Sequence, residues 1–242
     1  MNIENIENLT KASVNFQGLS HAAREKACEE YKQNEPKGLF ALRLTLDGQI
    51  SKLCGQFQEN IENSNEKISY QLDLSASLIR THFVINDLIM SGDIIEALTL
   101  IRKQIENFTR LVEIDEKPLG KLLKKTPNVC DILKKSGKKL YPQLSEVAHF
   151  GTPRVGELIR KNIKEENKFG PSVFPFYSDT LFEVYKQHSF VSIYFIFWIV
   201  GFLKSLYQDK YDSSSDEKII ESIFNKAVEM DVIIIESEDN KK

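Results

Sequence analysis

The sequence is poor in the residues that interrupt regular structure. Its 242 residues include only 11 glycines and 7 prolines. Apolar and polar residues do not alternate over any sustained stretch, so nothing competes with the helical periodicity. A shortage of turn residues favours long helices over many short strands. The sequence therefore predicts an all-α protein.

Cysteine is scarce as well, and the common signature motifs are absent. The three cysteines, Cys28, Cys54 and Cys130, lie far apart, with no C-x-x-C and no histidine within a few residues of any of them. This excludes the usual zinc spacing and gives no disulfide framework. No Gly-rich phosphate loop, dinucleotide fingerprint, nucleophile elbow or H-E-x-x-H is present. We expect free thiols in a reducing cytoplasm, and neither a metal nor a cofactor.

Long hydrophobic runs are few. The charge-free stretch from 187 to 203 falls short of the about 18–20 residues that span a bilayer. A helix that is apolar all round is typical of the centre of a helical bundle. We therefore expect this helix to form the core and expect no membrane partner. The acidic N-terminal residues do not resemble a signal peptide.

Apolar residues recur with helical periodicity along most of the chain. The clearest stripe lies between Ile94 and Val112, with spacings of four and three. The short Ser91-Gly92 link predicts that this helix pairs antiparallel with the preceding one. We expect an antiparallel helical bundle with a long apolar central helix and a short irregular or hairpin insert near 166–178. The expected organisation is an N-terminal helical extension (1–36), a bundle (37–230) and a charged C-terminal tail (231–242).

Several local features follow from the same patterns. Asp93 and Glu96 are expected to form a capping box. Pro142 suits the first position of a helix that Gly151 ends. Other expectations are separate helices over 1–16 and 20–34, an edge position for His82, and a short strand over 232–235.

Arg102 and Glu106 are the first candidates for a functional site. They lie one helical turn apart and each follows a core position, so both fall at the edge of the apolar stripe. Glu before Arg is the more stabilising order for a simple surface pair, and the reverse order suits a polar site or an interhelix clamp. An ordinary intrahelical ion pair remains the alternative.

His149 is the candidate acid or base. It falls in the last turn of its predicted helix, on the same face as Ser145 and Tyr141. A helix C-terminus favours a protonated imidazole, and a histidine that cycles near neutral pH can transfer protons. Arg154 follows across a turn and could approach the same place. The alternative is a histidine bonded to a carbonyl of its own helix.

Positive charge is concentrated around this histidine. Residues 117–164 contain ten lysines and two arginines against three acidic residues, a local net charge of +9 in a chain that carries −3. Such asymmetry is typical of a polyanion site, and lysine favours phosphate over base contacts. The lysines expected to bind ligand are Lys134, Lys135, Lys138 and Lys139.

The order of these motifs resembles a group of uncharacterised bacterial helical proteins related to the HEPN superfamily. A helical hairpin ends in Ser-Gly-Asp, the next helix reads Ala-Leu-x-Leu-Ile-Arg-x-x-x-Glu to Glu106, and Leu-Ser-x-x-x-His ends at His149. HEPN domains are helical bundles that commonly dimerise, and many are metal-independent RNases of toxin–antitoxin and phage-defence systems. Their usual active site is an arginine and a histidine with four to six residues between them, paired across a dimer. No arginine lies between 111 and 153 here, so Arg102 or Arg154 would have to take that place.

Two functions remain open at this stage. In the first, a cytoplasmic, dimeric HEPN-like protein binds RNA or another phosphate-bearing ligand, with His149 as acid or base in RNA cleavage. Arg102 or Arg154 would then stabilise the phosphorane, and Glu106 would orient the arginine. In the second, the chain is a non-catalytic interaction or dimerisation module, and the same residues join helices.

Overall fold

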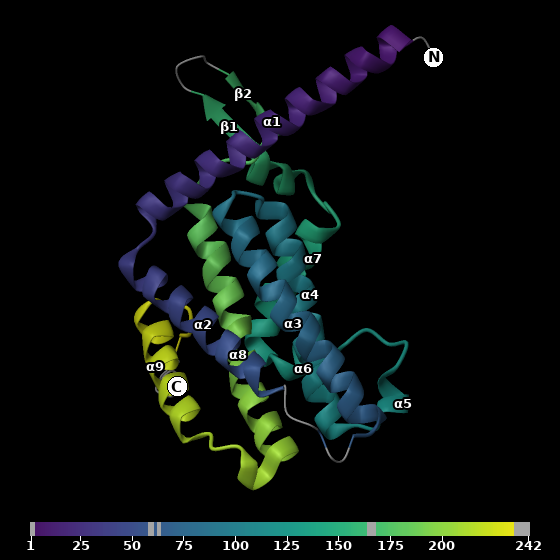
Figure 1. Ribbon diagram of the computed structural model, residues 1–242, viewed down its shortest axis with the longest axis vertical. Helices are drawn as coiled ribbons and strands as arrows, with labels where there is room; N and C mark the ends of the chain where they lie inside the picture. The colour runs from purple at the N-terminus through teal and green to yellow at the C-terminus, as the bar shows by residue number, and fades with distance from the viewer. Residues whose placement is uncertain (1–2, 58–60, 62–63, 164–167, 235–242) are drawn as a thin grey trace, which may run out of the picture.

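The computed structural model describes residues 3–57, 61, 64–163 and 168–234, and the predicted all-α bundle is confirmed (Figure 1). The N-terminal half contains the four helices α1 (Ile3–Asn34), α2 (Lys37–Gln56), α3 (Glu66–Met90) and α4 (Ile94–Glu116). Shorter helices follow: α5 (Leu119–Leu122), α6 (Val129–Ile132), α7 (Lys134–Ala148) and the 3₁₀ helix η1 (Pro153–Ile159). The remaining elements are β1 (Arg160–Ile163), β2 (Lys168–Pro171), α8 (Thr180–Tyr207), η3 (Gln208–Lys210) and α9 (Ser214–Glu229).

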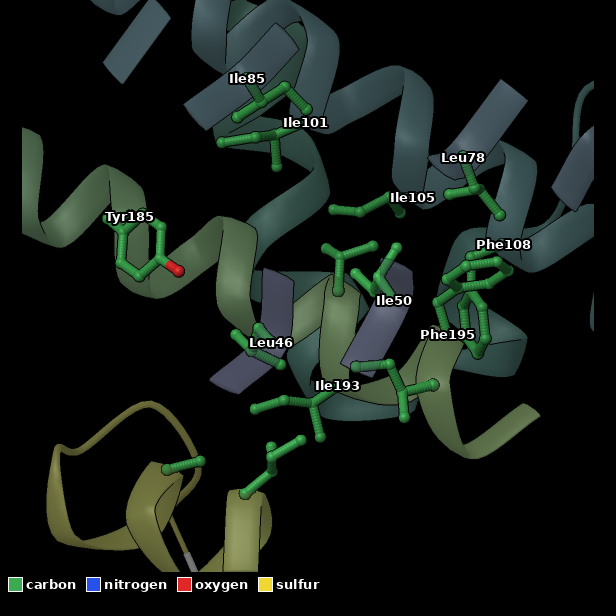
Figure 2. Packing of buried hydrophobic residues seen from close by; sticks show 14 of the residues in the cluster. Leu46, Ile50, Leu78, Ile85, Ile101, Ile105, Phe108, Tyr185, Ile193 and Phe195 are labelled. Atoms are coloured by element: carbon green, nitrogen blue, oxygen red, sulfur yellow. The ribbon is translucent and has the colours of Figure 1, made fainter. Parts of the chain in front are cut away.

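The core forms where α2, α3, α4 and α8 meet. Figure 2 shows buried side chains from these helices in one cluster, among them Ile50, Leu78, Ile105 and Phe195. The helices α3 and α4 pack side by side as the hairpin that the short link predicts. Because each helix contributes a stripe at steps of three and four, the bundle buries those stripes and leaves the flanking positions at the seams.

The central helix α8 needs one correction. It is the one helix in the described chain long and apolar enough to cross a membrane, over Thr180–Lys210 with a mean hydropathy of 1.8, so the expectation that it is too short is wrong. In the structure 56% of its apolar window is buried. It packs against α2, α3, α4 and α9, which is the central position that the sequence predicts.

The helix α1 is a single long helix rather than the two separate ones expected. Its N-terminal half projects from the bundle in Figure 1, and its C-terminal half packs through Ala27 and Tyr31. Arg24 fixes it to the α3–α4 turn, because the Nε and Nη2 atoms donate to the two carboxylate oxygens of Asp93 at 2.9 and 3.0 Å. The division at residues 36 and 37 stays a prediction.

The same turn explains why the expected capping box is wrong. Asp93 is the N-cap residue of α4, but its side chain caps no backbone N–H there. Its carboxylate instead accepts from Arg24 and from the hydroxyl of Ser91. Gly92 is required in this turn, because it has a φ of +80° and a Cβ would lie 2.5 Å from the carbonyl oxygen of Phe176.

Two other local expectations are wrong, and the expected insert is found with different bounds. Pro142 lies inside α7 rather than at its start, since the helix begins eight residues earlier. The insert is a hairpin that begins earlier than expected, pairing Arg160 with Pro171, and residues 166 and 167 lie outside the described chain. Val232 and Ile233 form a bend rather than a strand, and residues 235–242 of the expected tail lie outside the described residues.

His82 lies in the core rather than at an edge. Its side chain is 1% exposed and bridges three helices. The Nε2 atom lies 2.7 Å from Oδ1 of Asp47 on α2, and the Nδ1 atom lies 3.0 Å from the hydroxyl of Ser192 on α8. His188 stacks on the same ring at 4.7 Å and donates from Nδ1 to Oε1 of Gln104. A polar network therefore runs through the centre of the bundle.

His188 makes the stability of the fold depend on pH. Burial lowers the pKa of His188 well below its ordinary value, and the charge of His82 lowers it further. The unfolded chain takes up a proton below about pH 6.5 that the folded protein does not. The free energy of unfolding is therefore highest above that pH and decreases, by up to about 1.4 kcal/mol per pH unit from this group, as the pH falls. Urea titrations between about pH 8 and pH 5 should show a shallower decrease for His188→Gln.

The control is His21→Gln, which changes an exposed histidine on α1. It should keep the slope of the parent protein. A His188→Gln variant with the parent slope would contradict the assignment of this pH dependence to the buried imidazole.

Candidate functional site

The candidate site lies at the seam between α4 and α7. The core positions Ile101 and Ile105 of α4 are fully buried, so the residues that follow them, Arg102 and Glu106, lie at the edge of the packed face. The helix α7 packs across this edge, and its last turn carries His149. Because both helices use apolar stripes to pack, the polar residues beside the stripes are brought face to face.

The structure brings Arg102, Glu106, Tyr141 and His149 together. The Nε atom of Arg102 donates to Oε1 of Glu106 at 3.1 Å, and the hydroxyl of Tyr141 donates to the same oxygen at 2.6 Å. The Nη1 atom of Arg102 lies 2.8 Å from Nε2 of His149. The guanidinium also lies over the Tyr141 ring, 5.5 Å from its centroid. Glu106 and Tyr141 thus hold the arginine while its outer edge meets the imidazole.

The hydrogen bonds assign donors and acceptors in this cluster. A guanidinium only donates, so Nε2 of His149 is the acceptor in its contact with Arg102. Burial disfavours the charged guanidinium of Arg102, but the hydrogen bond of Tyr141 and the charge of Glu106 outweigh it and raise its pKa. Burial and the bond to Glu106 raise the pKa of Tyr141, so the phenol keeps its proton.

The cluster is open to solvent. The side chains of Arg102 and Glu106 are 20% and 27% exposed, and His149 is exposed. An ion can therefore reach the guanidinium and the imidazole without displacing the core. The alternative expectation was that His149 bonds to a carbonyl of its own helix. Its backbone N–H does bond to the carbonyl of Ser145, but its side chain reaches α4 instead.

The backbone that presents His149 is strained. The helix ends with Gly151 N–H on the carbonyl of Glu146 and Phe150 N–H on that of Val147, which is a Schellman arrangement. The left-handed position therefore falls on Phe150, with a φ of 49°, rather than on Gly151. A residue with a Cβ is destabilised in the left-handed conformation. Such backbone strain is concentrated at functional sites.

The other predicted residues lie around the cluster without joining it. Lys138, Tyr141, Ser145 and His149 follow one another at steps of three and four, which places them within an arc of about 80° on one face of α7. Lys139 points about 100° away from Lys138. These lysines, with Lys134 and Lys135, are exposed.

Arg154 is not brought into the cluster. It is exposed on η1, and within the described residues no hydrogen bond or ion pair joins it to His149 or Glu106. Of the two arginines that the sequence offered for this place, the structure favours Arg102.

Sequence reasoning missed the polar network in the core, although its signal was present. Leu78, His82, Ile85 and Ile89 follow one another at steps of four, three and four, so the histidine occupies a core position. Asp47, His82 and Ser192 have the connectivity of a hydrolase triad. The serine is only 4% exposed and its hydroxyl donates to the carbonyl of His188, so a substrate has no access to it.

Comparisons with known proteins give no relative for this chain. A scan of family models found no match, and neither a search of curated proteins nor one of solved structures found a similar protein. Within the described residues, no group of three or more His, Cys, Asp or Glu side chains could hold a metal ion. The geometry of the α4–α7 cluster and the sequence motifs are therefore the features of this chain that bear on its function.

Replacement of Phe150 tests the strain next to His149. Phe150→Gly should raise the free energy of unfolding by about 1 kcal/mol, because glycine adopts the left-handed conformation without a Cβ clash. The thermal midpoint should rise by about 2–4 °C. Ala148→Gly, in the last helical residue, is the control and should lower it. A lower midpoint for Phe150→Gly would show that the aromatic packing outweighs the strain.

Proposed function

We propose that this protein binds RNA through its phosphates at the α4–α7 cluster, as the resemblance to HEPN domains implies. The observation that supports this most is the 2.8 Å contact between Nη1 of Arg102 and Nε2 of His149 at a solvent-open place. A guanidinium held on one side by a carboxylate presents its remaining N–H groups in the fork that matches a phosphate. The exposed lysines of α7 add positive charge on the same flank.

A bound phosphate changes the contacts of the cluster in a defined way. The outer N–H groups of Arg102 turn from the imidazole to the phosphate oxygens, while the Nε atom stays on Glu106. Nε2 of His149 then loses its donor and becomes free to accept a proton. The resting bond between the two residues thus occupies Nε2 until an anion arrives.

The freed nitrogen has the chemistry of a general base for RNA. Accepting the proton of a ribose 2′-hydroxyl would let O2′ attack the adjacent phosphorus, and the arginine would stabilise the charge that develops on the phosphorane. The P–O5′ bond then breaks, the 5′-oxygen leaves with a proton from water or from the protonated imidazole, and the products are a 2′,3′-cyclic phosphate and a 5′-hydroxyl. This chemistry needs no metal. It also gives Tyr141 and Glu106 a positioning role, because they contact the arginine and not the reacting atoms.

One observation favours the second function, a non-catalytic interaction module. The projecting half of α1 exposes large apolar side chains, including Leu9 (60% exposed) and Val14 (64% exposed). An unsupported helix with exposed apolar residues is marginal in water and gains stability when another helix covers it. In that function a dimer or a partner protein would contact α1, and the α4–α7 cluster would only join helices.

Removal of Arg102 separates the two functions. Arg102→Gln should weaken the binding of single-stranded RNA about tenfold or more at low salt, because hydrogen bonds to a charged group are lost. Arg154→Gln removes the same charge from an exposed residue outside the cluster and should change the affinity little. Fluorescence anisotropy with a labelled oligonucleotide measures both variants.

His149→Ala completes this experiment. It should reduce RNA binding, and any cleavage, while leaving the melting curve close to that of the parent protein. Equal losses in Arg102→Gln and Arg154→Gln would place the contact elsewhere. Intact, unbound RNA with the parent protein at low salt would contradict the proposal, and a His149→Ala variant that only melts earlier would favour the interaction module.

The lysines of α7 provide a second prediction about the direction of the bound strand. Lys138 lies on the same face as His149, whereas its neighbour Lys139 does not. If the backbone of the RNA follows this face, Lys138→Gln should reduce the slope of log affinity against log salt by about 0.7, the value of one phosphate contact. Lys139→Gln, with the same charge change, should leave the slope unchanged. Equal slopes for the two variants would contradict a strand that follows this face of α7.

A further inference from the structure

A second site lies at the end of the bundle away from α1, between the start of α3, the end of α4 and α8 (Figure 1). It is a hollow of about 600 Å³, within the size range of small-molecule sites. One wall consists of the aromatic residues Phe197, Trp198 and Phe202, and Gly201 lies between them. A Cβ on Gly201 would meet nothing within 4 Å, so the space above this glycine is open.

The aromatic wall is well ordered by stacking. Trp198 stacks on Phe202 with ring centroids 4.8 Å apart and an interplanar angle of 21°, and on Phe195 at 6.4 Å and 17°. Phe197 lines the hollow and remains 48% exposed, although its ring also packs nearly at right angles to that of Phe224, with centroids 6.4 Å apart. An exposed aromatic ring attracts organic cations through its negative face.

A carboxylate is fixed beside this wall. Oδ2 of Asp115 accepts from Nε1 of Trp198 at 2.7 Å, and Oδ1 accepts from Nε2 of Gln71 at 2.8 Å. Both donors are neutral, so they orient the carboxylate without cancelling its charge. No ion pair of Asp115 is formed with any residue that the structure describes. The negative charge therefore remains available to a ligand.

The place of Asp115 in its helix is unfavourable for stability. It lies in the last turn of α4, where the helix carbonyls disfavour a negative charge, and no basic residue accompanies it there. A basic residue at this position would have been the stabilising choice. The oriented carboxylate is thus present although the helix dipole disfavours it, and it lies next to the ring of the chain's single tryptophan.

We propose that this hollow binds an aliphatic ammonium ion, with Asp115 as its counter-charge and the ring of Phe197 against its alkyl groups. The combination of an oriented, unpaired carboxylate with an aromatic wall is the chemistry that recognises such cations. Lys67 lies at the rim and is the residue that opposes a cation. The site lies near the other end of α4 from Arg102, and this proposal does not depend on RNA binding.

Trp198 is the built-in reporter for this test. Titration of the full chain with choline and with spermidine should change its fluorescence and saturate, whereas potassium chloride at matched ionic strength should not. A greater affinity for choline would indicate a quaternary ammonium headgroup, and a greater affinity for spermidine a polyamine. The absence of a saturable change with both amines would overturn the proposal.

Two variants locate the binding. Asp115→Asn should weaken it about tenfold, since the counter-charge is lost while the hydrogen bond from Trp198 can remain. Glu116→Gln removes the same charge from the next residue, which does not line the hollow, and should retain the parent affinity. Equal losses in both variants would overturn the proposal, because they would show only a general attraction to the acidic helix end.

A third variant keeps the carboxylate and fills the space. Gly201→Leu places a side chain in the open part of the hollow without a backbone clash and should abolish the fluorescence response. Leucine also has a higher helix propensity than glycine, so the melting temperature of the Gly201→Leu variant should not fall below that of the parent protein. Lys67→Gln should strengthen binding. Retention of the parent affinity in Gly201→Leu would place the cation outside the hollow and contradict the assignment.

Discussion

The packing of α4 against α7 determines where every polar group of the candidate site lies. The stripe of α4 is buried, and α7 covers one edge of it, so Arg102 and Glu106 lie at the seam between the two helices. Glu106 accepts from both Arg102 and Tyr141, which joins the two helices through one carboxylate oxygen. The arginine is thereby oriented before any ligand arrives, and preorganised donors stabilise a developing charge most effectively.

The residues of this site could be predicted from the sequence, but their contacts could not. Arg102 and Glu106 flank a 4-3-4 stripe, and His149 shares a face with Tyr141, so each pair follows from helical spacing alone. The contact between Arg102 and His149 joins residues 47 positions apart and depends on the register of two helices. The lone arginine at 154 was an equal candidate by sequence, and only the path of η1 separates it from the cluster.

Local patterns failed where a distant residue competes for the same group. Asp93 has the spacing of a capping residue, yet Arg24, 69 positions away, binds its carboxylate. His82 was expected at an edge because Arg80 and Asp87 lie near it on its helix, although its position falls on an apolar stripe. It is accommodated in the core only because Asp47 and Ser192, from two other helices, satisfy its ring nitrogens. Propensity and periodicity describe one helix at a time, and these interactions belong to the assembly.

The two ends of α4 now differ in chemistry. Near its first half lies a guanidinium beside an imidazole and the lysines of α7, and at its last turn lies an unpaired carboxylate beside aromatic rings. The net charge of the whole chain, −3, does not reveal this separation, because the net charge of +9 on residues 117–164 is offset by acidic residues elsewhere in the chain. Since exposed charges are screened beyond about 10 Å at moderate salt, each end acts on its own surroundings. Under the two proposals, the helix that organises the core carries an anion site and a cation site at separate places, and neither neutralises the other.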